Sequence, residues 1–241
     1  MDYSSFLELV KNRRSIRRFR PDSIPDDYIE KIIEAARWAP SGYNSQPWEF
    51  IVVKDKKLKD NILQTIDLHK SLIGAAEITG SERRQQQMAY PWLNEEKDYH
   101  IAPVLIILFS DTRANVALPD MGKRYPEKTR LLFNSSLSCA FIYMQLAATT
   151  LGLATQWLGV MPKQAEVLAQ ILGVPKEFEF YEMMPVGYPA YKPRPKLLRP
   201  RDKMVHYDHP GKGDFRTDAE VNDFAWRTWT WTTSNHRRGV D

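Results

Sequence analysis

The chain has 241 residues, and its 34 lysine and arginine residues against 30 acidic ones give a formal net charge of +4. Hydrophobic residues make up 43% and charged residues 27% of the sequence, which is typical of a globular protein with its own core. The single cysteine, Cys139, excludes an internal disulfide and fits a reducing compartment. The small net charge does not require an anionic macromolecule as a partner.

The sequence predicts no targeting or membrane segment. The opening MDYSSFLELVKNRR lacks the basic and then apolar pattern of a signal peptide. The longest apolar runs, such as VLIILF at 104–109, are too short to cross a bilayer. We therefore expect a cytoplasmic protein with no membrane partner.

Apolar spacing predicts helices and strands through the first half of the chain. Helices are expected over 4–12 and from about 25 to 40, and the β-branched run WEFIVVK at 48–54 predicts a strand. Helical spacing returns over 57–69. Residues 70–100 are polar with scattered aromatic residues, so we expect surface loops and helical fragments there.

The second half continues the same alternation. Residues 103–111 form an apolar run without polar alternation, which predicts a buried strand. The elements that follow are expected to be a loop over 112–129, a long helix over about 130–151, a strand over 154–160, a helix over 162–173 and a last strand over 178–188.

The composition changes at residue 189. Proline and basic residues become frequent and predict an extended arm, because proline continues neither a helix nor a central strand. The end of the chain holds three of the seven tryptophans, and we expect this apolar surface to pack on the body or on a second subunit. We predict one domain over 1–207 and a C-terminal extension over 208–241.

The most unusual stretch is NRRSIRRFRPDSIP at 12–25, in which five of the eight residues from Arg13 to Arg20 are arginine. It is compatible with a solvated basic turn, a nucleic-acid contact or a site for a phosphorylated cofactor. In an extended chain Arg13, Ser15 and Arg17 point the same way and present two guanidinium groups to a phosphate. No nucleic-acid partner is expected, because the chain has no basic stripe, zinc-ligand spacing or known binding module.

A second cluster, APSGYNSQPWEF at 39–50, joins a predicted helix to a predicted strand. Its proline, glycine, serine and asparagine residues are common in any connector between a helix and a strand. The cluster also offers neutral amide and hydroxyl groups, which suit the alternating donors and acceptors of an isoalloxazine ring. Asn44 and Gln46 can each donate and accept hydrogen bonds.

RRSIRRF followed by APSGYNSQPWEFIVV resembles the FMN-dependent nitroreductase family. The resemblance runs from about residue 8 to 207 and includes LGLATQWLGV, LGVPKEFEFYEMMPVGYP and RPRDKMVHYD; residues 208–241 lie outside it. It implies an α+β, three-layer α/β/α fold, in which helices flank a mixed, largely antiparallel sheet. It also implies an intertwined homodimer with FMN at the subunit interface.

The resemblance further implies a cofactor site in four segments. Arg13, Arg14, Ser15 and Arg17 are expected to bind the phosphate, the ribityl chain and the pyrimidine edge of FMN. The segment with Pro40, Ser41 and Asn44 reaches the flavin from the other subunit. Trp157, Leu158 and Gly159 run past the ring near its reactive nitrogen. The arm gives one further basic phosphate ligand, and because Leu198 stands where the family often has a basic residue, Arg199 or Arg201 takes that role.

The expected chemistry is hydride transfer through FMN, to which the protein contributes position and electrostatics. NADH or NADPH delivers a hydride and leaves, and an electron-poor acceptor such as a nitroaromatic or a quinone then occupies the same face in ping-pong turnover. A guanidinium from Arg13 or Arg17 near the pyrimidine edge would stabilise the reduced flavin. No side-chain nucleophile or metal is required, and no set of ligands has metal spacing.

Residues 65–100 are expected to select the electron acceptor. They are the counterpart of a variable region that covers the flavin in this family. Tyr90, Trp92 and Tyr99 are candidates for stacking on an aromatic acceptor, and packing of a surface helix explains each of them equally well. His69 and His100 are candidate proton donors.

Two other functions stay open. Iodotyrosine deiodinases and related reductive dehalogenases share the RRS and APSG…PW motifs, but they carry a lysine for the amino-acid carboxylate where the nearest counterpart here is Asn94. The other possibility is a flavin-binding protein without turnover or a basic nucleic-acid-binding protein.

Overall fold

A computed structural model describes residues 1–78, 98–117, 124–193, 195–211 and 213–234. The described residues fall into two compact units, one ending at Ala190 and the other beginning at Tyr191. The first unit contains α1 (Tyr3–Asn12), α2 (Asp26–Arg37), η1 (Gly42–Asn44), β1 (Trp48–Val53), α3 (Lys56–Ile78), η3 (Asp98–His100), β2 (Val104–Asp111), η4 (Thr112–Ala117), α6 (Pro126–Thr150), β3 (Ala154–Thr155), α7 (Pro162–Ile171) and β4 (Phe178–Gly187).

The sheet has the strand order β1-β2-β4-β3, and all three pairings are antiparallel. Strand β2 lies in the middle and is buried from Val104 to Phe109, as its unbroken apolar run predicted. The register shifts between Leu108 and Phe109, which pair with Glu182 and Phe180, so Tyr181 is the extra residue of a β-bulge. One parallel bridge joins Ser15 to Thr155.

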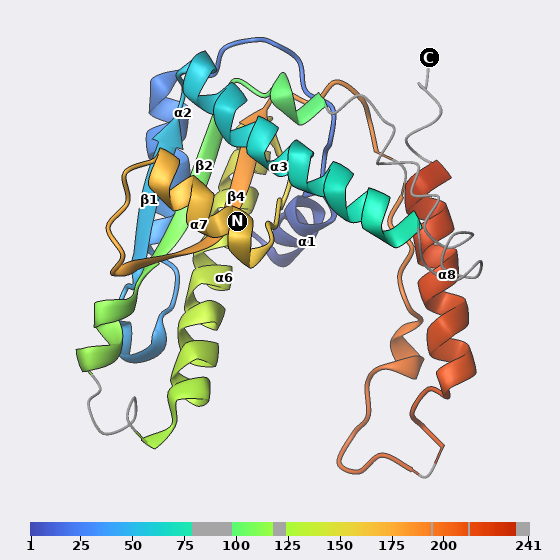
Figure 1. The fold of residues 1–241 in the computed structure, drawn as a ribbon. Coiled ribbons are helices and arrows are strands. Elements are labelled where there is room, and N and C mark those ends of the chain that lie inside the picture. Colours follow the sequence, from blue (N-terminus) through green and yellow to red (C-terminus); the bar gives the residue numbers. More distant parts are fainter. Residues whose placement is uncertain (79–97, 118–123, 194, 212, 235–241) are drawn as a thin grey trace. The chain divides into compact units, whose positions relative to one another are not determined.

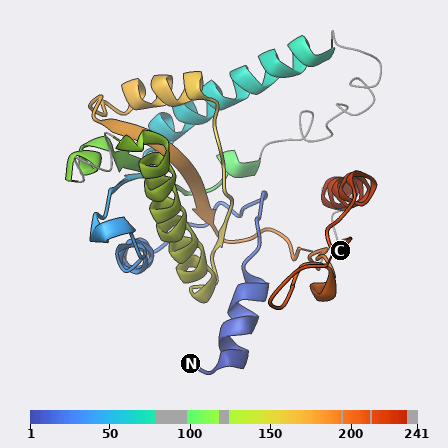
Figure 2. The same cartoon turned by 90° about the horizontal axis from the view of Figure 1, so that it is seen from below.

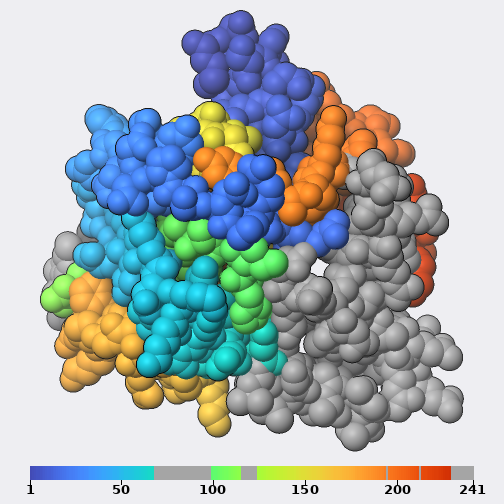
Figure 3. Space-filling view, turned by 90° about the horizontal axis from the view of Figure 1, so that it is seen from above, coloured from blue at the N-terminus to red at the C-terminus, as the bar shows by residue number. Residues whose placement is uncertain are grey.

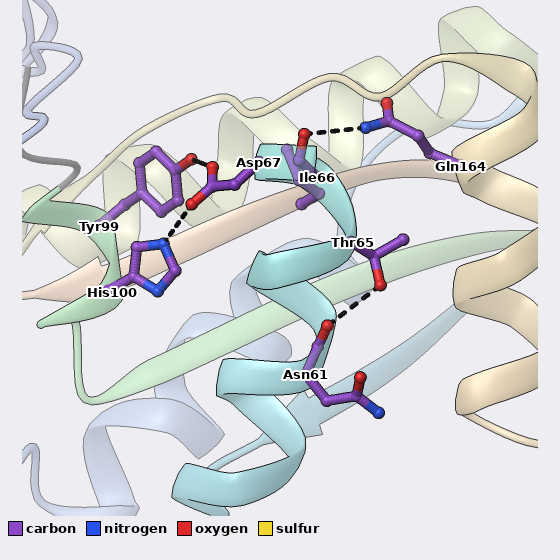
Figure 4. Close-up of polar contacts among 7 residues, drawn as sticks. All are labelled: Asn61, Thr65, Ile66, Asp67, Tyr99, His100 and Gln164. Carbon is purple, nitrogen blue, oxygen red and sulfur yellow. Dashed lines mark hydrogen bonds and ion pairs between the residues drawn. The ribbon is translucent and has the colours of Figure 1, made fainter. Parts of the chain in front are cut away.

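Helices cover both faces of this sheet (Figures 1 and 2). Helices α2 and α6 lie on one face, and α3 and α7 lie on the other. On the first face, a core cluster joins Ile32 of α2 and Phe141 of α6 to Leu108 of β2. On the other face, the Gln164 side chain of α7 donates to the Ile66 carbonyl of α3 at 3.2 Å (Figure 4). The α+β, three-layer fold is confirmed.

Helix α6 is long and apolar enough to span a membrane by length and composition alone. Its packing explains this composition, because nine of its residues are buried, among them Leu137, Ala140 and Phe141 in the core cluster. The same helix contacts α1, α2, η1 and the sheet. It is therefore the central scaffold of the unit.

Three predicted boundaries are wrong. Helix α6 starts at Pro126 inside the predicted loop, since Pro126 and Glu127 both suit a first helical turn. Helix α3 continues to Ile78 instead of ending at residue 69. The strand predicted over 154–160 has only two regular residues, and a single bridge from Leu158 to Met183 continues it.

The second unit contains η5 (Arg201–Lys203) and the helix α8 (Asp218–Ser234). Thr217 and Glu220 form a reciprocal cap at the start of α8: the Thr217 N–H donates to Glu220 at 2.8 Å, and the Glu220 N–H donates to Thr217 at 3.3 Å. A helix in this extension was not predicted. Packing of residues 208–241 on the body or a partner stays a prediction, as does a domain boundary at residue 207.

Candidate functional site

The arginine-rich stretch is an extended segment fixed to the sheet. The Ile16 N–H donates to the Thr155 carbonyl at 2.9 Å, and the Arg20 N–H donates to the Tyr188 carbonyl at 2.9 Å. Ile16 and Phe19 are buried, so this segment is anchored by apolar side chains as well as by its backbone.

Arg13, Arg14, Ser15 and Arg17 are all half-buried. Burial, followed by the neighbouring charge of Arg14, lowers the pKa of Arg13. Across the described residues, no carboxylate lies within ion-pair distance of these three arginines, whereas Arg20 pairs with Asp22 at 3.4 Å. A bound anion would relieve both the desolvation and the repulsion between the cations.

Gln145 of α6 holds the Arg13 side chain. The Arg13 Nη1 donates to Gln145 Oε1 at 3.4 Å, and Gln145 is only 1% exposed. Its Nε2 is buried without a hydrogen-bond partner among the residues described. Sequence reasoning missed Gln145, although a glutamine within the apolar stripe of a core helix was a usable signal.

The turn over residues 41–46 has an unusual backbone. Tyr43, Asn44 and Gln46 have φ values of 56°, 54° and 45°, in the left-handed region that costs a non-glycine residue about 1 kcal/mol or more. A Cβ atom on Gly42 would lie 2.5 Å from side-chain carbons of Leu132, so any larger residue there would require Leu132 to move. The Gly42 N–H donates to Ser136 Oγ of α6 at 3.1 Å.

The turn is held from within and leaves polar groups at the surface. Ser41 Oγ accepts from the Gln46 N–H at 3.0 Å, and the Gln46 amide donates to Asn44 Oδ1 at 3.4 Å. In the described part of the chain, the side-chain NH2 group of Asn44 and the side-chain carbonyl oxygen of Gln46 have no hydrogen-bond partner. Pro40, just before the turn, is exposed. The turn therefore offers a fixed donor and a fixed acceptor.

The stretch from Trp157 to Gly159 lies at the edge of the sheet. The Leu158 N–H donates to the Met183 carbonyl at 3.0 Å, and the Met183 N–H donates back to Leu158 at 3.2 Å. The Trp157 ring packs against Phe141 of α6, with ring centroids 4.3 Å apart. Gly159 is exposed, so its backbone is accessible to a ligand.

Helix α6 separates the turn from the arginines within one chain. The turn contacts Leu132 and Ser136, whereas Arg13 contacts Gln145. Nine residues of an α-helix span about 13 Å and rotate the contact by about half a turn. Figure 2 shows α1, which leads into Arg13, beside the C-terminal end of α6. The two predicted parts of a flavin site therefore contact α6 at different levels and on roughly opposite sides of the helix.

The predicted acceptor residues are only partly described. Tyr90, Trp92 and Asn94 lie outside the described residues, as does the side chain of His69. Tyr99 is 6% exposed, and its hydroxyl donates to Asp67 of α3 (Figure 4).

The environment of Tyr99 favours packing over stacking on an acceptor. Asp67 Oδ2 also contacts His100 Nε2 at 2.8 Å, and the Tyr99 and His100 rings stack 5.0 Å apart. Burial is the main cause that raises the pKa of Tyr99. The cluster joins η3 to α3, so it supports the fold of this region.

Replacing Tyr99 with phenylalanine is expected to lower the free energy of unfolding by about 1 kcal/mol, because the half-buried Asp67 carboxylate loses the hydrogen bond from the Tyr99 hydroxyl. Denaturant titration measures this change, and acceptor KM should stay near the wild-type value. A large rise in KM with unchanged stability would instead assign Tyr99 to acceptor binding.

The two arginines of the arm belong to the second unit. Arg199 Nη2 donates to the Lys203 carbonyl at 2.6 Å, and Arg199 lines a hollow with Lys203, Phe215 and Arg216. Arg201 starts η5 and is exposed. A phosphate contact from either residue stays a prediction. No group of metal-ligating side chains occurs among the described residues.

Solved structures identify the class of this fold. A BluB-like flavoprotein from Clostridium difficile 630 is 24% identical and superposes with a TM-score of 0.69, covering 87% of this chain and 100% of its own. The nitroreductase CinD from Lactococcus lactis, solved with 4-nitrophenol, is 18% identical with a TM-score of 0.67, covering 85% of this chain and 100% of its own. The chain therefore has the fold of the nitroreductase-like flavoproteins.

The family model named Nitroreductase family matches residues 10–188, and the chain belongs to this family. A protein of Methanothermobacter thermautotrophicus provisionally named NADH dehydrogenase/NAD(P)H nitroreductase is 28% identical, over 82% of this chain and 84% of its own length. An iodotyrosine deiodinase of Haliscomenobacter hydrossis is 30% identical, over 84% of this chain and 87% of its own length. The resemblance in the N-terminal motifs is thereby confirmed as family membership, and the chain is an oxidoreductase of this family.

Proposed function

We propose that the protein is an FMN-dependent oxidoreductase that takes electrons from NADH or NADPH and reduces an electron-poor small molecule. The observation that carries this proposal is the half-buried set of Arg13, Arg14 and Arg17, which has no carboxylate partner among the described residues. A phosphate monoester matches the planar guanidinium fork of arginine and supplies the missing negative charge. Family membership makes the FMN phosphate the first candidate.

The site would be completed by a second copy of the chain. Within one subunit, the turn at 41–46 and Arg13 contact α6 about 13 Å apart along the helix and on roughly opposite sides of it, so we expect the turn that meets these arginines to come from a partner. A homodimer with FMN at the subunit interface satisfies this geometry.

Helix α1 offers a surface for such a dimer. None of its residues is buried, and Tyr3, Phe6 and Val10 form an exposed apolar stripe with exposures of 75%, 43% and 42%. In the space-filling view, α1 (dark blue) projects from the surface (Figure 3). An apolar stripe on a projecting helix suits burial against a second subunit.

Each segment would act on the cofactor in its own way. Arg13, Arg14, Ser15 and Arg17 would hold the phosphate and the pyrimidine edge. The amide groups of Asn44 and Gln46 on the partner's turn would contact the ring from the other side. Bound FMN supplies hydride transfer, and the protein orients both substrates against one face of it. Trp157, Leu158 and Gly159 would line the ring edge, with Gly159 leaving the backbone accessible.

The test of this proposal is reduction of the bound FMN by NADH or NADPH, first without an acceptor and then with one. Purified protein loaded with FMN should lose its yellow colour under NADH or NADPH in the absence of oxygen. Adding a nitroaromatic or a quinone should restore the colour. Ping-pong turnover requires parallel double-reciprocal plots, and intersecting plots would contradict it. A colourless protein that takes up no FMN would overturn the proposal.

A second candidate is reductive dehalogenation of a halotyrosine. It is favoured by the relative from Haliscomenobacter hydrossis, which is named iodotyrosine deiodinase and is 30% identical over 84% of this chain. Turnover of halotyrosine by the dithionite-reduced protein, with release of halide, would establish it. The absence of halide release alongside reduction of nitroaromatics would leave the first function.

A further inference from the structure

Gln145 of α6 is a polar residue on the apolar, buried face of its helix. Phe141 lies four residues before it and Ala148 three residues after it on the same face, and both are completely buried. Gln145 itself is only 1% exposed. An apolar side chain would suit this face of the helix, so the amide group has to be explained by what it contacts.

A second buried glutamine, Gln164 of α7, shows how an amide is satisfied inside this fold. Its Nε2 donates to the Ile66 carbonyl at 3.2 Å, and its Oε1 accepts from the Met161 N–H at 2.7 Å. The side chain of Gln145 differs: Oε1 accepts from Arg13 Nη1 at 3.4 Å, and Nε2 is buried without a partner among the described residues. A buried donor without a partner destabilises a fold. Gln164 therefore has a structural role, whereas Gln145 weakens the fold and contacts an arginine of the candidate site.

Arg13 is held at two points. Its N–H donates to the Leu9 carbonyl at the end of α1 at 3.0 Å, and its side chain contacts Gln145 in α6. The amide of Gln145 carries no charge, so this contact orients the guanidinium group without neutralising it. A glutamate at the same place would form an ion pair with Arg13, and a bound anion would have to compete with that pair.

We infer that Gln145 is a positioning residue that orients Arg13 toward the phosphate of FMN. The inference rests on the proposed function for the identity of the ligand. Gln145 contacts Nη1 alone, and in the described part of the chain Nε and Nη2 of Arg13 have no hydrogen-bond partner. The edge that these two nitrogens form can donate two parallel hydrogen bonds to a phosphate.

This role predicts opposite effects on stability and on binding. Gln145→Leu removes the donor that has no partner, so the unfolding temperature without ligand should stay the same or rise. The Kd for FMN should rise by about two- to tenfold, because Arg13 loses the contact that fixes it. A residue needed only for packing would show the reverse, a lower unfolding temperature with an unchanged Kd.

The experiment compares four variants of the full chain with the wild type. Gln145→Leu is made alone and together with Arg13→Ala, and Gln145→Glu places a carboxylate beside Arg13. Gln164→Leu is the matched control, because Gln164 is a glutamine of similar burial with hydrogen bonds at both ends of its amide. The readouts are the unfolding temperature without ligand, its rise in inorganic phosphate, and the Kd for FMN from flavin fluorescence.

Gln145→Glu should weaken FMN binding by about tenfold or more, and by more than Gln145→Leu does. In the Arg13→Ala background, Gln145→Leu should cause no further loss, because it acts through Arg13. Gln164→Leu should lower the unfolding temperature and leave the Kd for FMN unchanged. Equal losses from Gln145→Leu with and without Arg13, or wild-type affinity in both Gln145 variants, would overturn the inference and leave the proposed function standing.

Absence of FMN binding by the wild type would instead overturn the proposed function. Inorganic phosphate then tests the position of Arg13 by itself. Stabilisation of the wild type by phosphate that is lost in Gln145→Glu would support the role of Gln145 in anion binding. Absence of this loss would overturn that role as well.

Discussion

Replacing Arg13 with alanine is expected to weaken FMN binding by about ten- to a hundredfold. A hydrogen bond between charged groups contributes about 1.5–3 kcal/mol, and each 1.4 kcal/mol is about a factor of ten in Kd. The protein should fold normally, because removing Arg13 relieves the desolvation and the repulsion from Arg14 that lower its pKa. Quenching of flavin fluorescence in a titration measures the change.

Two further variants make this result specific. Arg20→Ala removes an exposed arginine from the same stretch that already pairs with Asp22, and it should bind FMN as the wild type does. Arg13→Lys keeps the charge and loses the planar fork, so its affinity for FMN should lie between that of the wild type and that of Arg13→Ala. Equal losses in Arg13→Ala and Arg20→Ala would mean that the stretch acts only through its total charge.

Replacing Phe6 with aspartate should prevent the proposed dimer and remove FMN binding with it. Burial of a phenylalanine side chain contributes about 1.5–3 kcal/mol, and an unpaired carboxylate buried at the same place costs more. Together these effects should raise the dissociation constant of the dimer by about a hundredfold or more. Light scattering should show a monomer, and the flavin titration should show little binding.

Ser4→Asp is the matched control for Phe6→Asp. Ser4 is exposed on α1 and lies away from the stripe of Tyr3, Phe6 and Val10, so the same charge there should leave the dimer intact. A Phe6→Asp protein that stays dimeric and binds FMN would show that α1 is not part of the interface.

The sequence was most informative where a local pattern and tertiary packing agree. The unbroken apolar run at 104–109 is the buried central strand, and the arginine-rich stretch is joined to the sheet by backbone hydrogen bonds at Ile16 and Arg20. Helix α8 was not predicted, although Thr217 and Glu220 have the spacing of a capping box at a helix start. Helix α6 is longer than predicted, because Pro126 lies in its first turn and not in a loop.

The site was only partly predictable for a different reason. The motifs name residues that face a ligand, but they do not name the buried groups that hold those residues, such as Gln145 behind Arg13. A β-bulge depends on the register of two strands distant in sequence, so the extra residue at Tyr181 could not be predicted from the strand pattern. The hydrogen bond from Tyr99 to Asp67 joins two segments distant in sequence, so the spacing of the aromatic residues could not indicate it.

The central claim is that one flavin site needs Arg13 of one subunit and the turn of the other. The most direct test mixes two variants that each bind FMN poorly, Arg13→Ala and Ser41→Ala/Asn44→Ala, by refolding them together. A mixed dimer then has one doubly altered site and one intact site, so random pairing should restore tight FMN binding at about one site in four. Recovery of that fraction is the predicted result. No recovery from a mixture shown to contain mixed dimers would place the whole site within one chain and contradict the claim.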